Sequence, residues 1–398
     1  MRALIVEEGT SRAGLATARA LGIAGWTVGV GSPIPSLTAA SRWCTDSHVI
    51  PLPERGLKEF LAATRRAVRD GRYAVVIGSG DAEVFALSLG RETLGAVIPY
   101  PPHERVLAAF DKLELARVAA RAGLETPWTV PATEEAMAAL RGPAIMKARH
   151  HWLPGMGSAP PRHRTRVVFG RTGARIRAHQ IRSRRGEPIL QEMLTGELLA
   201  VCVVADHASR VVAAVHQRAE RLWPPQIGIS TRARTVEPDA QLTRGVSALI
   251  RELEWFGMAE IQFLVPSDGR PRIIDFNGRP YGSLALAVRA GVNLPAMAAA
   301  MALGLEPPDH SEARIGTRYH WLEGDLRRAF EQGRMGGLGR DIADSLRWAP
   351  GAVHSIWNVT DPMPAFRHVG RLAGYGWRKL FPPRTAGRKV LPVGETAA

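Results

Sequence analysis

The sequence predicts a doubly wound α/β domain, then an α+β region, then a mostly helical C-terminal extension. Over about residues 1–100, short apolar runs alternate with helical stretches, as in parallel sheets with helical crossovers. Over residues 101–305, several strands follow one another before the next helical stretch. Over residues 306–398, amphipathic helical stretches are separated by Gly- and Pro-containing links.

The composition indicates a globular protein of two or three domains. The chain has 398 residues, of which 45% are hydrophobic and 22% charged. Its two cysteines, Cys44 and Cys202, give no disulfide framework, which favours the reducing cytoplasm. No apolar run approaches the roughly 20 residues that span a bilayer, and the first residues lack a signal-peptide layout. We therefore expect a cytoplasmic protein without stable membrane insertion.

The basic charge points to small anionic ligands. The net charge is +15, yet the arginines are spread along the chain without an aromatic-interleaved patch, so we expect no nucleic-acid partner. An anionic nucleotide and an acidic co-substrate account for the same bias. Lysines are scarce among the 52 basic residues, namely Lys58, Lys112, Lys147, Lys379 and Lys389. Arg cannot replace a compact ammonium everywhere, so each of these lysines is a candidate functional group.

The N-terminal domain is predicted from a strand–turn–helix–strand start. Its expected strands and helices lie at residues 2–6, 13–24, 26–30, 48–50, 57–69, 73–77 and 82–89. The turn Gly9–Arg12 at a helix start is either an anion site or an ordinary capped helix. Asp81 is predicted to be the N-cap of the helix that follows it.

The middle of the chain opens after the helix breaker Pro99–His103. One helix is expected from Glu104, and a second from Asp111-Lys112 to about residue 122. Strands are expected at residues 126–129 and 143–147, the second ending in Lys147. Residues 148–170, rich in Gly, Pro, His and Arg, form either a mobile surface loop or a cover over phosphates.

Further strands are expected at residues 187–194, 198–206 and 210–216, before a helix at residues 240–253. The segment 216–234 carries several arginines, including Arg232, around a Pro-Pro turn. It is either a carboxylate- or phosphoryl-binding hairpin or a solvated basic one.

The hairpin Gly257–Ser283 is the strongest candidate site. Residues two apart in a strand share a face, so Glu260 joins Gln262 and Asp275 joins Asn277. The Pro-Ser-Asp-Gly turn sets 262 opposite 275 and 260 opposite 277, with Arg279 just beyond. Such oxygens suit Mg²⁺ with substrate phosphates, and an Arg suits a phosphate. The opposite face is predicted to be apolar through Ala259, Ile261, Phe263, Ile274 and Phe276.

Taken together, these features resemble the ATP-grasp superfamily, in particular its carbamoyl-phosphate-synthase-like carboxylate–amine ligases. The resemblance covers about residues 1–305. It rests on the DK helix start, the strand ending in Lys147, the pattern Q-E-x-x-x-G-E and the strand D-x-N-x-R. It implies a preceding α/β domain at 1–100 and a two-subdomain ATP-grasp fold at 101–305 with a lid subdomain at about 120–190. Residues 306–398 would be a helical extension.

The resemblance implies a site for ATP with Mg²⁺, or Mn²⁺ in its place. Lys112 and Lys147 would hold the phosphates and Arg279 would meet the γ-phosphoryl group. Catalytic roles are predicted for Lys147, Arg232 and Arg279. The predicted nucleotide-binding and metal-binding residues complete the site: Gln191, Glu192, Met193, Leu194 and Glu197 for the nucleotide, and Gln262, Asp275 and Asn277 for the metal.

The implied reaction joins a carboxylate to an amine through an acyl phosphate. Its substrates would be small molecules or peptides, which the sequence does not identify. Gln262 stands where the family usually has an acidic metal ligand, so two alternatives remain open. One is a catalytically active ligase, and the other is an ATP-binding scaffold or sensor with reduced or lost catalysis. Apart from these two, phosphoryl transfer without an amine is a further hypothesis.

The extension is predicted to contain a helix from about residue 319 to 331, another at 342–348, and a basic helix at 365–380. The basic helix either touches a membrane or acidic partner, or docks on its own domain. The last dozen residues are expected to be disordered. A homodimer is compatible with these features.

Overall fold

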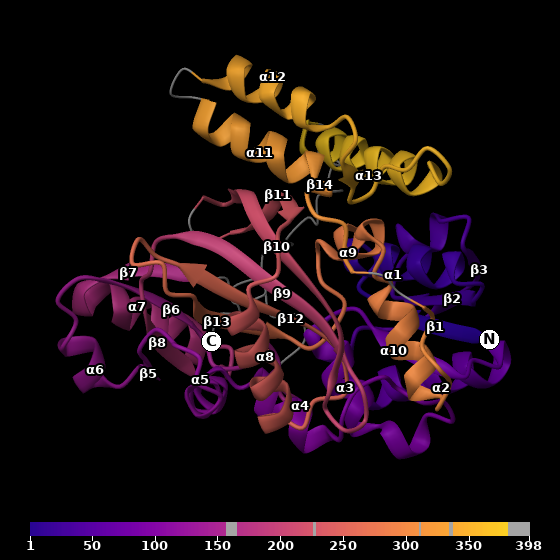
Figure 1. The fold of residues 1–398 in the computed structure, drawn as a ribbon, viewed down its shortest axis with the longest axis horizontal. Coiled ribbons are helices and arrows are strands. Elements are labelled where there is room, and N and C mark those ends of the chain that lie inside the picture. Colours follow the sequence, from indigo (N-terminus) through magenta and orange to yellow (C-terminus); the bar gives the residue numbers. More distant parts are fainter. Residues whose placement is uncertain (157–164, 226–227, 310–311, 334–336, 381–398) are drawn as a thin grey trace, which may run out of the picture.

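The computed structural model describes residues 1–156, 165–225, 228–309, 312–333 and 337–380 (Figure 1). Three sheets organise this part of the chain. Their strand orders are β3-β2-β1-β4, β13-β12-β9-β10-β11-β14-β15 and β5-β8-β6-β7. Within the described ranges, no single helix is long and apolar enough to cross a membrane; α9 and α10 pass that test only as a pair, bent by 92°.

The N-terminal sheet is doubly wound, as predicted. All of its strand pairs are parallel. Ala3 and Ile5 pack with α1 residues on one face of β1, whereas Leu4 and Val6 face the other core. Its elements are β1 (Arg2–Val6), α1 (Arg12–Ile23), β2 (Thr27–Ser32), β3 (Cys44–Val49), α2 (Leu57–Gly71), β4 (Val75–Gly78) and α3 (Asp81–Leu89), with short 3₁₀ turns at Thr38–Ala40, Pro53–Arg55 and Arg91–Thr93.

A small antiparallel sheet follows, reached through two helices. Its strands pair as β5 with β8, β8 with β6, and β6 with β7. Helix α7 contributes Ala174, Ala178 and Ile181 to the separate apolar core under this sheet. The elements are α4 (His103–Phe110), α5 (Lys112–Arg121), β5 (Thr129–Pro131), α6 (Glu134–Ala138), β6 (Pro143–Ala148), β7 (Arg166–Phe169), α7 (Gly170–Arg182) and β8 (Pro188–Glu192).

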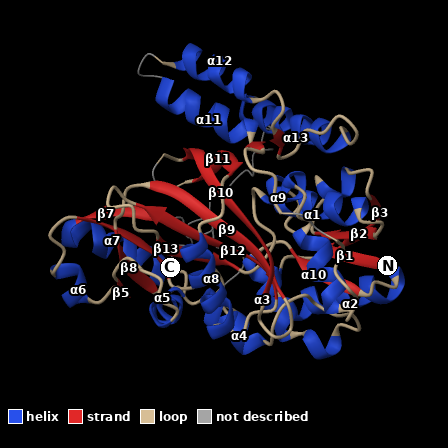
Figure 2. Ribbon diagram, in the orientation of Figure 1, coloured by secondary structure: helices blue, strands red, loops and turns tan. Residues whose placement is uncertain are grey.

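The large sheet forms the centre of the molecule (Figure 2). Its first five strands run antiparallel to their neighbours. The elements are β9 (Glu197–Ala205), β10 (Val211–Trp223), β11 (Ile229–Thr235), α8 (Ala240–Glu252), β12 (Gly257–Val265), β13 (Arg272–Asn277), α9 (Leu284–Ala290), α10 (Leu294–Ala302), β14 (Arg318–His320) and β15 (Val353–His354).

The extension contributes strands as well as helices. Residues 319–321 were expected to lead into a helix, but Arg318–His320 form β14, which pairs with β11 of the large sheet. Burial explains this, because Tyr319 is fully buried against Ala233 and Leu286. The helices are α11 (Leu322–Gly333), α12 (Leu338–Trp348) and α13 (Met363–Leu380). Figure 1 shows α11 beside α12, above the β11 end of the sheet.

The extension docks on the N-terminal domain. Asp361 is buried and accepts hydrogen bonds from Arg19 Nε (2.8 Å), Ser41 Oγ (2.7 Å) and the Arg42 backbone N–H (2.8 Å). From α13, Arg371 Nη1 donates to the Gly9 carbonyl at 3.0 Å. Docking on its own domain is therefore what the described part of the basic helix does. The expected disorder of the last residues lies outside the described ranges.

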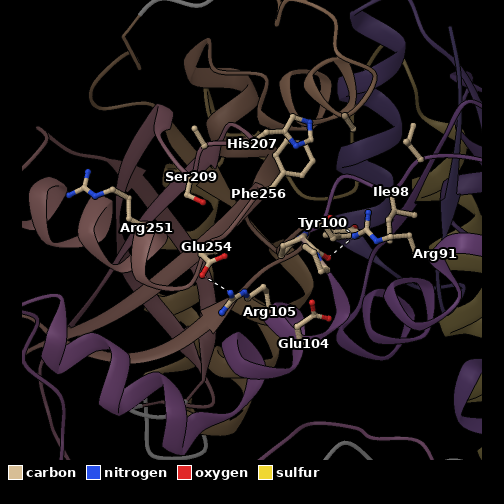
Figure 3. Close-up of a pocket in the computed structure, with 15 residues that line it drawn as sticks. Arg91, Ile98, Tyr100, Glu104, Arg105, His207, Ser209, Arg251, Glu254 and Phe256 are labelled. Atoms are coloured by element: carbon tan, nitrogen blue, oxygen red, sulfur yellow. Dashed lines mark hydrogen bonds and ion pairs between the residues drawn. The ribbon is translucent and has the colours of Figure 1, made fainter.

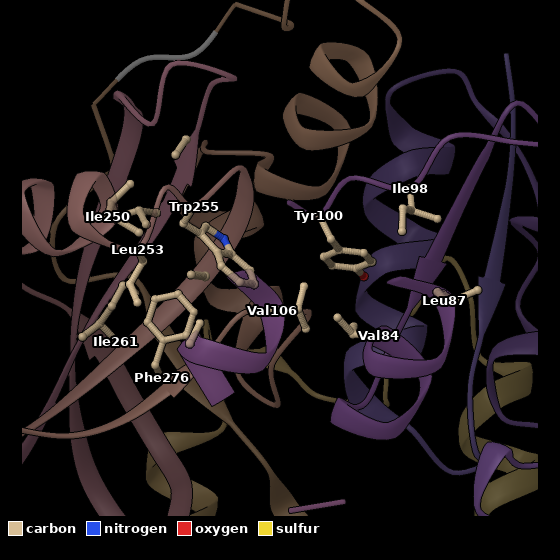
Figure 4. Packing of buried hydrophobic residues seen from close by; sticks show 14 of the residues in the cluster. Val84, Leu87, Ile98, Tyr100, Val106, Ile250, Leu253, Trp255, Ile261 and Phe276 are labelled. Carbon is tan, nitrogen blue, oxygen red and sulfur yellow. The ribbon is translucent and has the colours of Figure 1, made fainter. Parts of the chain in front are cut away.

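One apolar core joins the N-terminal domain to the large sheet. Figure 4 shows Val84, Leu87, Ile98, Tyr100 and Val106 gathered toward side chains of the large sheet and α8. The partners labelled there are Ile250, Leu253, Trp255, Ile261 and Phe276. This shared core crosses the predicted boundary near residue 100 and fixes β12 and β13 against the first domain.

Gly257 makes the closest backbone approach in this junction. It has φ +95°, and a Cβ there would lie 2.1 Å from the Pro99 carbonyl oxygen. We expect Gly257→Ala to lower the free energy of unfolding by about 1–3 kcal/mol more than Gly123→Ala. Gly123 has φ +75° but open space around its Cβ position, so it carries the same backbone strain without the clash. Urea denaturation of both variants tests this; equal midpoints would contradict it.

Candidate functional site

The β12–β13 hairpin has the predicted register. Glu260 pairs with Asn277 and Gln262 pairs with Asp275. These four side chains therefore share one face of the large sheet, while Ile261 and Phe263 point into the core. The alternation read from the sequence is confirmed for β12.

A β-bulge in β13 changes the expected apolar face. Phe263 pairs with Ile273, which leaves Ile274 as the extra residue. Ile273 is buried in the core beside Phe276, so the prediction that Ile274 lies on the apolar face is wrong. The carbonyl of Ile274 instead accepts a hydrogen bond from Lys147 Nζ at 3.0 Å. The bulge thus gives the lysine of the small sheet a partner on the large sheet.

Two lysines from different elements meet Asp275. Lys112 is the first residue of α5, which Asp111 caps, and Lys147 lies near the end of β6; both are nearly buried. Burial lowers the pKa of Lys147 to about 8, with Asp275 and Lys112 acting in opposite directions. Burial alone would raise the pKa of Asp275, but Lys112 and Lys147 hold it below its usual value. The site is therefore a carboxylate facing two ammonium groups.

Glu260 is the centre of a hydrogen-bond network. Its Oε1 accepts from Gln217 Nε2 (3.2 Å), and its Oε2 accepts from Gln262 Nε2 (3.1 Å) and Asn277 Nδ2 (3.0 Å). Burial raises the pKa of Glu260 to about 7, although Arg279 and these amides act to lower it. A second carboxylate therefore stands beside Asp275, on the neighbouring strand.

Arg279 connects this network to the N-terminal domain. It forms an ion pair with Asp81, and its Nη2 donates to Asn277 Oδ1 at 3.1 Å. Asp81 was predicted to cap α3, but Gly80 is the N-cap and the Asp81 side chain binds Arg279 and His151 instead. Burial would raise the pKa of Asp81, but Arg279 and His151 hold it well below the usual range. The Asp81 side chain therefore pairs with Arg279 instead of capping the N-terminus of α3.

The segment predicted to hold the nucleoside joins the two sheets. Glu192 ends β8 and accepts from the Trp128 backbone N–H at 3.3 Å, and Met193 and Leu194 are half-buried in the link to β9. Gln191 is buried and donates to Thr129 Oγ1 at 2.9 Å, so its amide faces the small sheet. Glu197 is exposed at the start of β9, with Arg218 Nη1 at 3.4 Å.

Arg232 lies away from this group. Strand pairing leads from Gln262 through Ala200 and Gln217 to Thr235, so the side chains of these residues share one face of the large sheet. Side chains alternate between faces along a strand, and Arg232 is three residues from Thr235. Arg232 therefore lies on the opposite face. There it donates to Asp325 Oδ2 at 2.7 Å and Asp344 Oδ2 at 2.9 Å. We therefore withdraw the predicted catalytic role of Arg232 and regard it as a structural residue.

The turn Gly9–Arg12 is filled by the protein itself. Glu7 is buried and accepts from the Ser11 backbone N–H at 3.0 Å, and Ser11 Oγ caps α1 by accepting from the Gly14 N–H at 2.9 Å. Of the two readings open from the sequence, the capped helix therefore describes this turn.

The predicted metal ligands fit a hard cation that also binds phosphate. Within the described residues, Asp275 accepts no hydrogen bond and is only half-buried, so a cation can reach its oxygens. Asn277 and Gln262 add amide oxygens on the same face. One carboxylate with phosphate oxygens is a usual Mg²⁺ arrangement. In the same part of the chain there is no cluster of three or more His, Cys, Asp or Glu residues that could hold a metal.

Comparisons with known proteins show which fold the chain has. A family model described as ATP-grasp in the biosynthetic pathway with Ter operon matches residues 185–325. A biotin carboxylase–β-γ-ATP complex from Campylobacter jejuni superimposes with a TM-score of 0.63 at 15% identity, over 80% of this chain and 74% of that one. The chain has the ATP-grasp fold.

Two other solved structures also have a fold similar to that of this chain. N5-carboxyaminoimidazole synthetase from Staphylococcus aureus, complexed with ADP, gives a TM-score of 0.60 at 15% identity, over 84% of this chain and 86% of that one. L-amino acid ligase from Bacillus licheniformis gives 0.56 at 13% identity, over 77% and 75%. No curated protein matches the chain in sequence.

The candidate site contains residues that the sequence did not single out. His151 comes from the segment after β6 and contacts Asp81, while Trp152 packs edge-on against Phe85 of α3. Residues 157–164, the centre of the predicted phosphate cover, lie outside the described part of the chain. Only the position of Lys147 just before this segment could have drawn attention to His151.

A pocket elsewhere in the molecule holds none of the predicted site residues. It has a volume of about 650 Å³ and lies between residues 97–105 and the β9–β10 turn (Figure 3). His207 stacks on Phe256 with 3.8 Å between ring centroids, and Arg105 pairs with Glu254. It lies at the far end of β9 from Glu197, so we do not assign it to the nucleotide.

Proposed function

We propose that the protein is an ATP-dependent ligase that joins a carboxylate to an amine through an acyl phosphate. The observation that carries the proposal is the meeting of Lys112, Lys147 and Asp275 at the junction of two sheets, with Arg279 on the same face. Proteins of similar structure include an L-amino acid ligase, a synthetase complexed with ADP and a biotin carboxylase complexed with β-γ-ATP. The cytoplasm is the proposed location, because ATP is available there and both cysteines are free.

In this proposal the two lysines hold the ATP phosphates. The segment Glu192–Leu194 presents its edge to the adenine, and Glu197 takes the ribose hydroxyls. Asp275, with the amide oxygens of Gln262 and Asn277, would hold Mg²⁺. When bound, that ion would neutralise part of the phosphate charge.

The reaction has two steps. First, a carboxylate oxygen of the substrate attacks the γ-phosphorus, the bond to the β-phosphate oxygen breaks, and ADP leaves. Second, the amine nitrogen attacks the acyl carbon, the bond to the phosphate oxygen breaks, and the amine loses a proton. The residues contribute mainly positioning and charge. Arg279 would exchange part of its contact with Asp81 for the transferring phosphoryl group.

A non-catalytic ATP-binding protein is the second candidate. The observation that favours it is Gln262, a neutral residue whose amide nitrogen is engaged by Glu260. Calorimetric titration with ATP and Mg²⁺, followed by assays of ADP and phosphate release with paired acids and amines, separates the two. Binding with release that depends on both co-substrates supports the ligase. Binding without release for any pair supports the sensor, and absence of binding rejects both.

Gln262→Glu probes the unusual metal ligand. It would place a second carboxylate beside Glu260, so we expect lower thermal stability in the absence of Mg²⁺ because of like-charge repulsion. With Mg²⁺ and ATP we expect equal or tighter nucleotide binding, since the added charge favours the cation. Differential scanning fluorimetry with and without Mg·ATP measures both effects. A large loss of ATP affinity would show that residue 262 does not face the metal.

The lowered pKa of Lys147 predicts that nucleotide binding depends on pH. Because its pKa in the free protein is about 8, its ammonium is charged below that value and neutral above it. We expect ATP affinity to fall as the pH rises from about 8 to about 9.5, a range in which the phosphates of ATP are already ionised. Lys147→Arg stays charged throughout and should flatten the profile. A flat wild-type profile in calorimetric titrations would contradict this role.

A further inference from the structure

Arg12 is a cation without a carboxylate partner at the edge of the proposed site. It begins α1, and its guanidinium lies 3.8 Å from the centroid of the Trp321 ring while Nη1 donates to Tyr319 Oη at 2.9 Å. Within the part of the chain that the structure describes, no acidic group lies within ion-pair distance of it. A guanidinium stacked in this way keeps further N–H groups free for an anion.

The loop after Arg279 makes room for this guanidinium. A Cβ on Gly282 would lie 3.0 Å from Arg12 Nη2, so the absence of a side chain at residue 282 lets the loop backbone lie close to the guanidinium. Tyr319 Oη donates to the Gly282 carbonyl at 2.8 Å and thereby ties Arg12 to that loop. The next residue, Ser283, accepts at Oγ from Gln217 Nε2 at 2.8 Å.

Gln217 and Glu260 present acceptors on the same side. Gln217 is buried, and its Nε2 donates to Glu260 Oε1 at 3.2 Å. Its Oε1 is buried with no hydrogen-bond partner among the described residues. A buried acceptor without a donor is costly, so it marks a place where a ligand N–H would be stabilised.

We propose that Arg12, Gln217 and Glu260 form the subsite for the amine substrate, and that this substrate is a free amino acid. Its carboxylate binds the Arg12 guanidinium in a charge-assisted pair, and its amino group lies at Gln217 Oε1 and the Glu260 carboxylate. The inference rests on the proposed function, because it names the chemical class of one of the two substrates. It also gives the extension a role, since β14 and Trp321 hold Arg12 in place.

Matched probes test the inference without any mutation. The full chain, saturated with Mg²⁺ and a non-hydrolysable ATP analogue, is titrated calorimetrically with the common L-amino acids and with their decarboxylated amines. Such pairs include glycine with methylamine, L-alanine with ethylamine and L-serine with ethanolamine. We expect at least one amino acid to bind about 10-fold or more tightly than its amine, the usual effect of a lost charged hydrogen bond. Equal binding within every pair, or no binding of any amino acid, would overturn the inference.

Two arginine variants locate the carboxylate. Arg12→Ala should remove the difference between an amino acid and its amine and leave binding of the ATP analogue unchanged, which also shows that the fold is intact. Arg42→Ala is the matched control, because Arg42 likewise lies over a tryptophan ring, at 5.3 Å from the Trp43 centroid, but its guanidinium donates to the Thr360 carbonyl at 3.2 Å. Unchanged discrimination in Arg12→Ala would place the carboxylate elsewhere and overturn the inference.

Turnover separates this inference from the proposed function. ADP release with amines that lack a carboxylate, at rates equal to those of amino acids, would leave the ligase standing and reject the subsite. Tight amino-acid binding that depends on Arg12, without ADP release in the presence of any acid, would leave the subsite standing and reject the ligase.

Discussion

Asp275→Asn is expected to reduce ATP-dependent turnover by about 10²–10³-fold, the range seen when one preorganised electrostatic group is removed from an active site. Asp275 is the carboxylate that faces Lys112 and Lys147, and it is the only charged member of the predicted metal-binding set. The substitution keeps the shape of the side chain but removes its charge. The bound cation would then lose its one anionic protein ligand. ADP release under saturating Mg·ATP measures the effect.

Asp268→Asn is the matched control for this prediction. Asp268 lies in the turn of the same hairpin, is exposed, and binds Arg272 Nη2 at 2.7 Å outside the site. The same chemical change there should leave turnover at the wild-type level. If Asp275→Asn also keeps wild-type turnover, the proposed position of the metal is wrong.

The regular parts of this fold are predictable from local sequence. The parallel N-terminal sheet, α5 with its Asp111 cap, and the register of β12 with β13 all follow from apolar periodicity and turn residues. In each case the information lies within a few residues of the element itself. A tight turn and a period of two were enough to put Glu260 opposite Asn277.

The remainder depends on contacts between residues distant in the chain. The bulge at Ile274 is set by Lys147 and by the core around Phe263, and neither is visible within the hairpin sequence. Asp81 has the pattern of an N-cap, yet an arginine 198 positions later binds its side chain. These are cases in which charge pairing or burial outweighs a local preference worth about 1 kcal/mol.

The role of Arg232 likewise could not be predicted from local sequence. Its segment of the sequence also carries Arg218, Arg221 and Arg234, a pattern that suits anion binding. Its partners are Asp325 of α11 and Asp344 of α12, and a one-residue difference in strand register decides which face it occupies. The sequence of the hairpin does not contain that information.

Asp325→Ala is expected to lower the free energy of unfolding by about 3–5 kcal/mol, the usual cost of removing one partner from a buried ion pair. Asp325 is almost fully buried and accepts from Arg232 and from Ser345 Oγ, each at 2.7 Å. Burial would raise its pKa, but His320, Ser345 and Arg232 hold it well below its usual value. Its stabilising contribution is therefore complete above the ordinary carboxylate pKa and is lost only as the pH falls toward the lower folded value.

Asp344→Ala tests whether the stability loss depends on burial of the carboxylate that pairs with Arg232. Asp344 also pairs with Arg232, but 43% of its side chain is exposed, so water can replace it and we expect a loss of about 1 kcal/mol or less. Urea denaturation at neutral pH should therefore rank Asp325→Ala far below Asp344→Ala in stability. Equal losses would mean that Arg232 is not held mainly by Asp325. A variant with native stability but no turnover at either position would instead favour a role of Arg232 in the reaction.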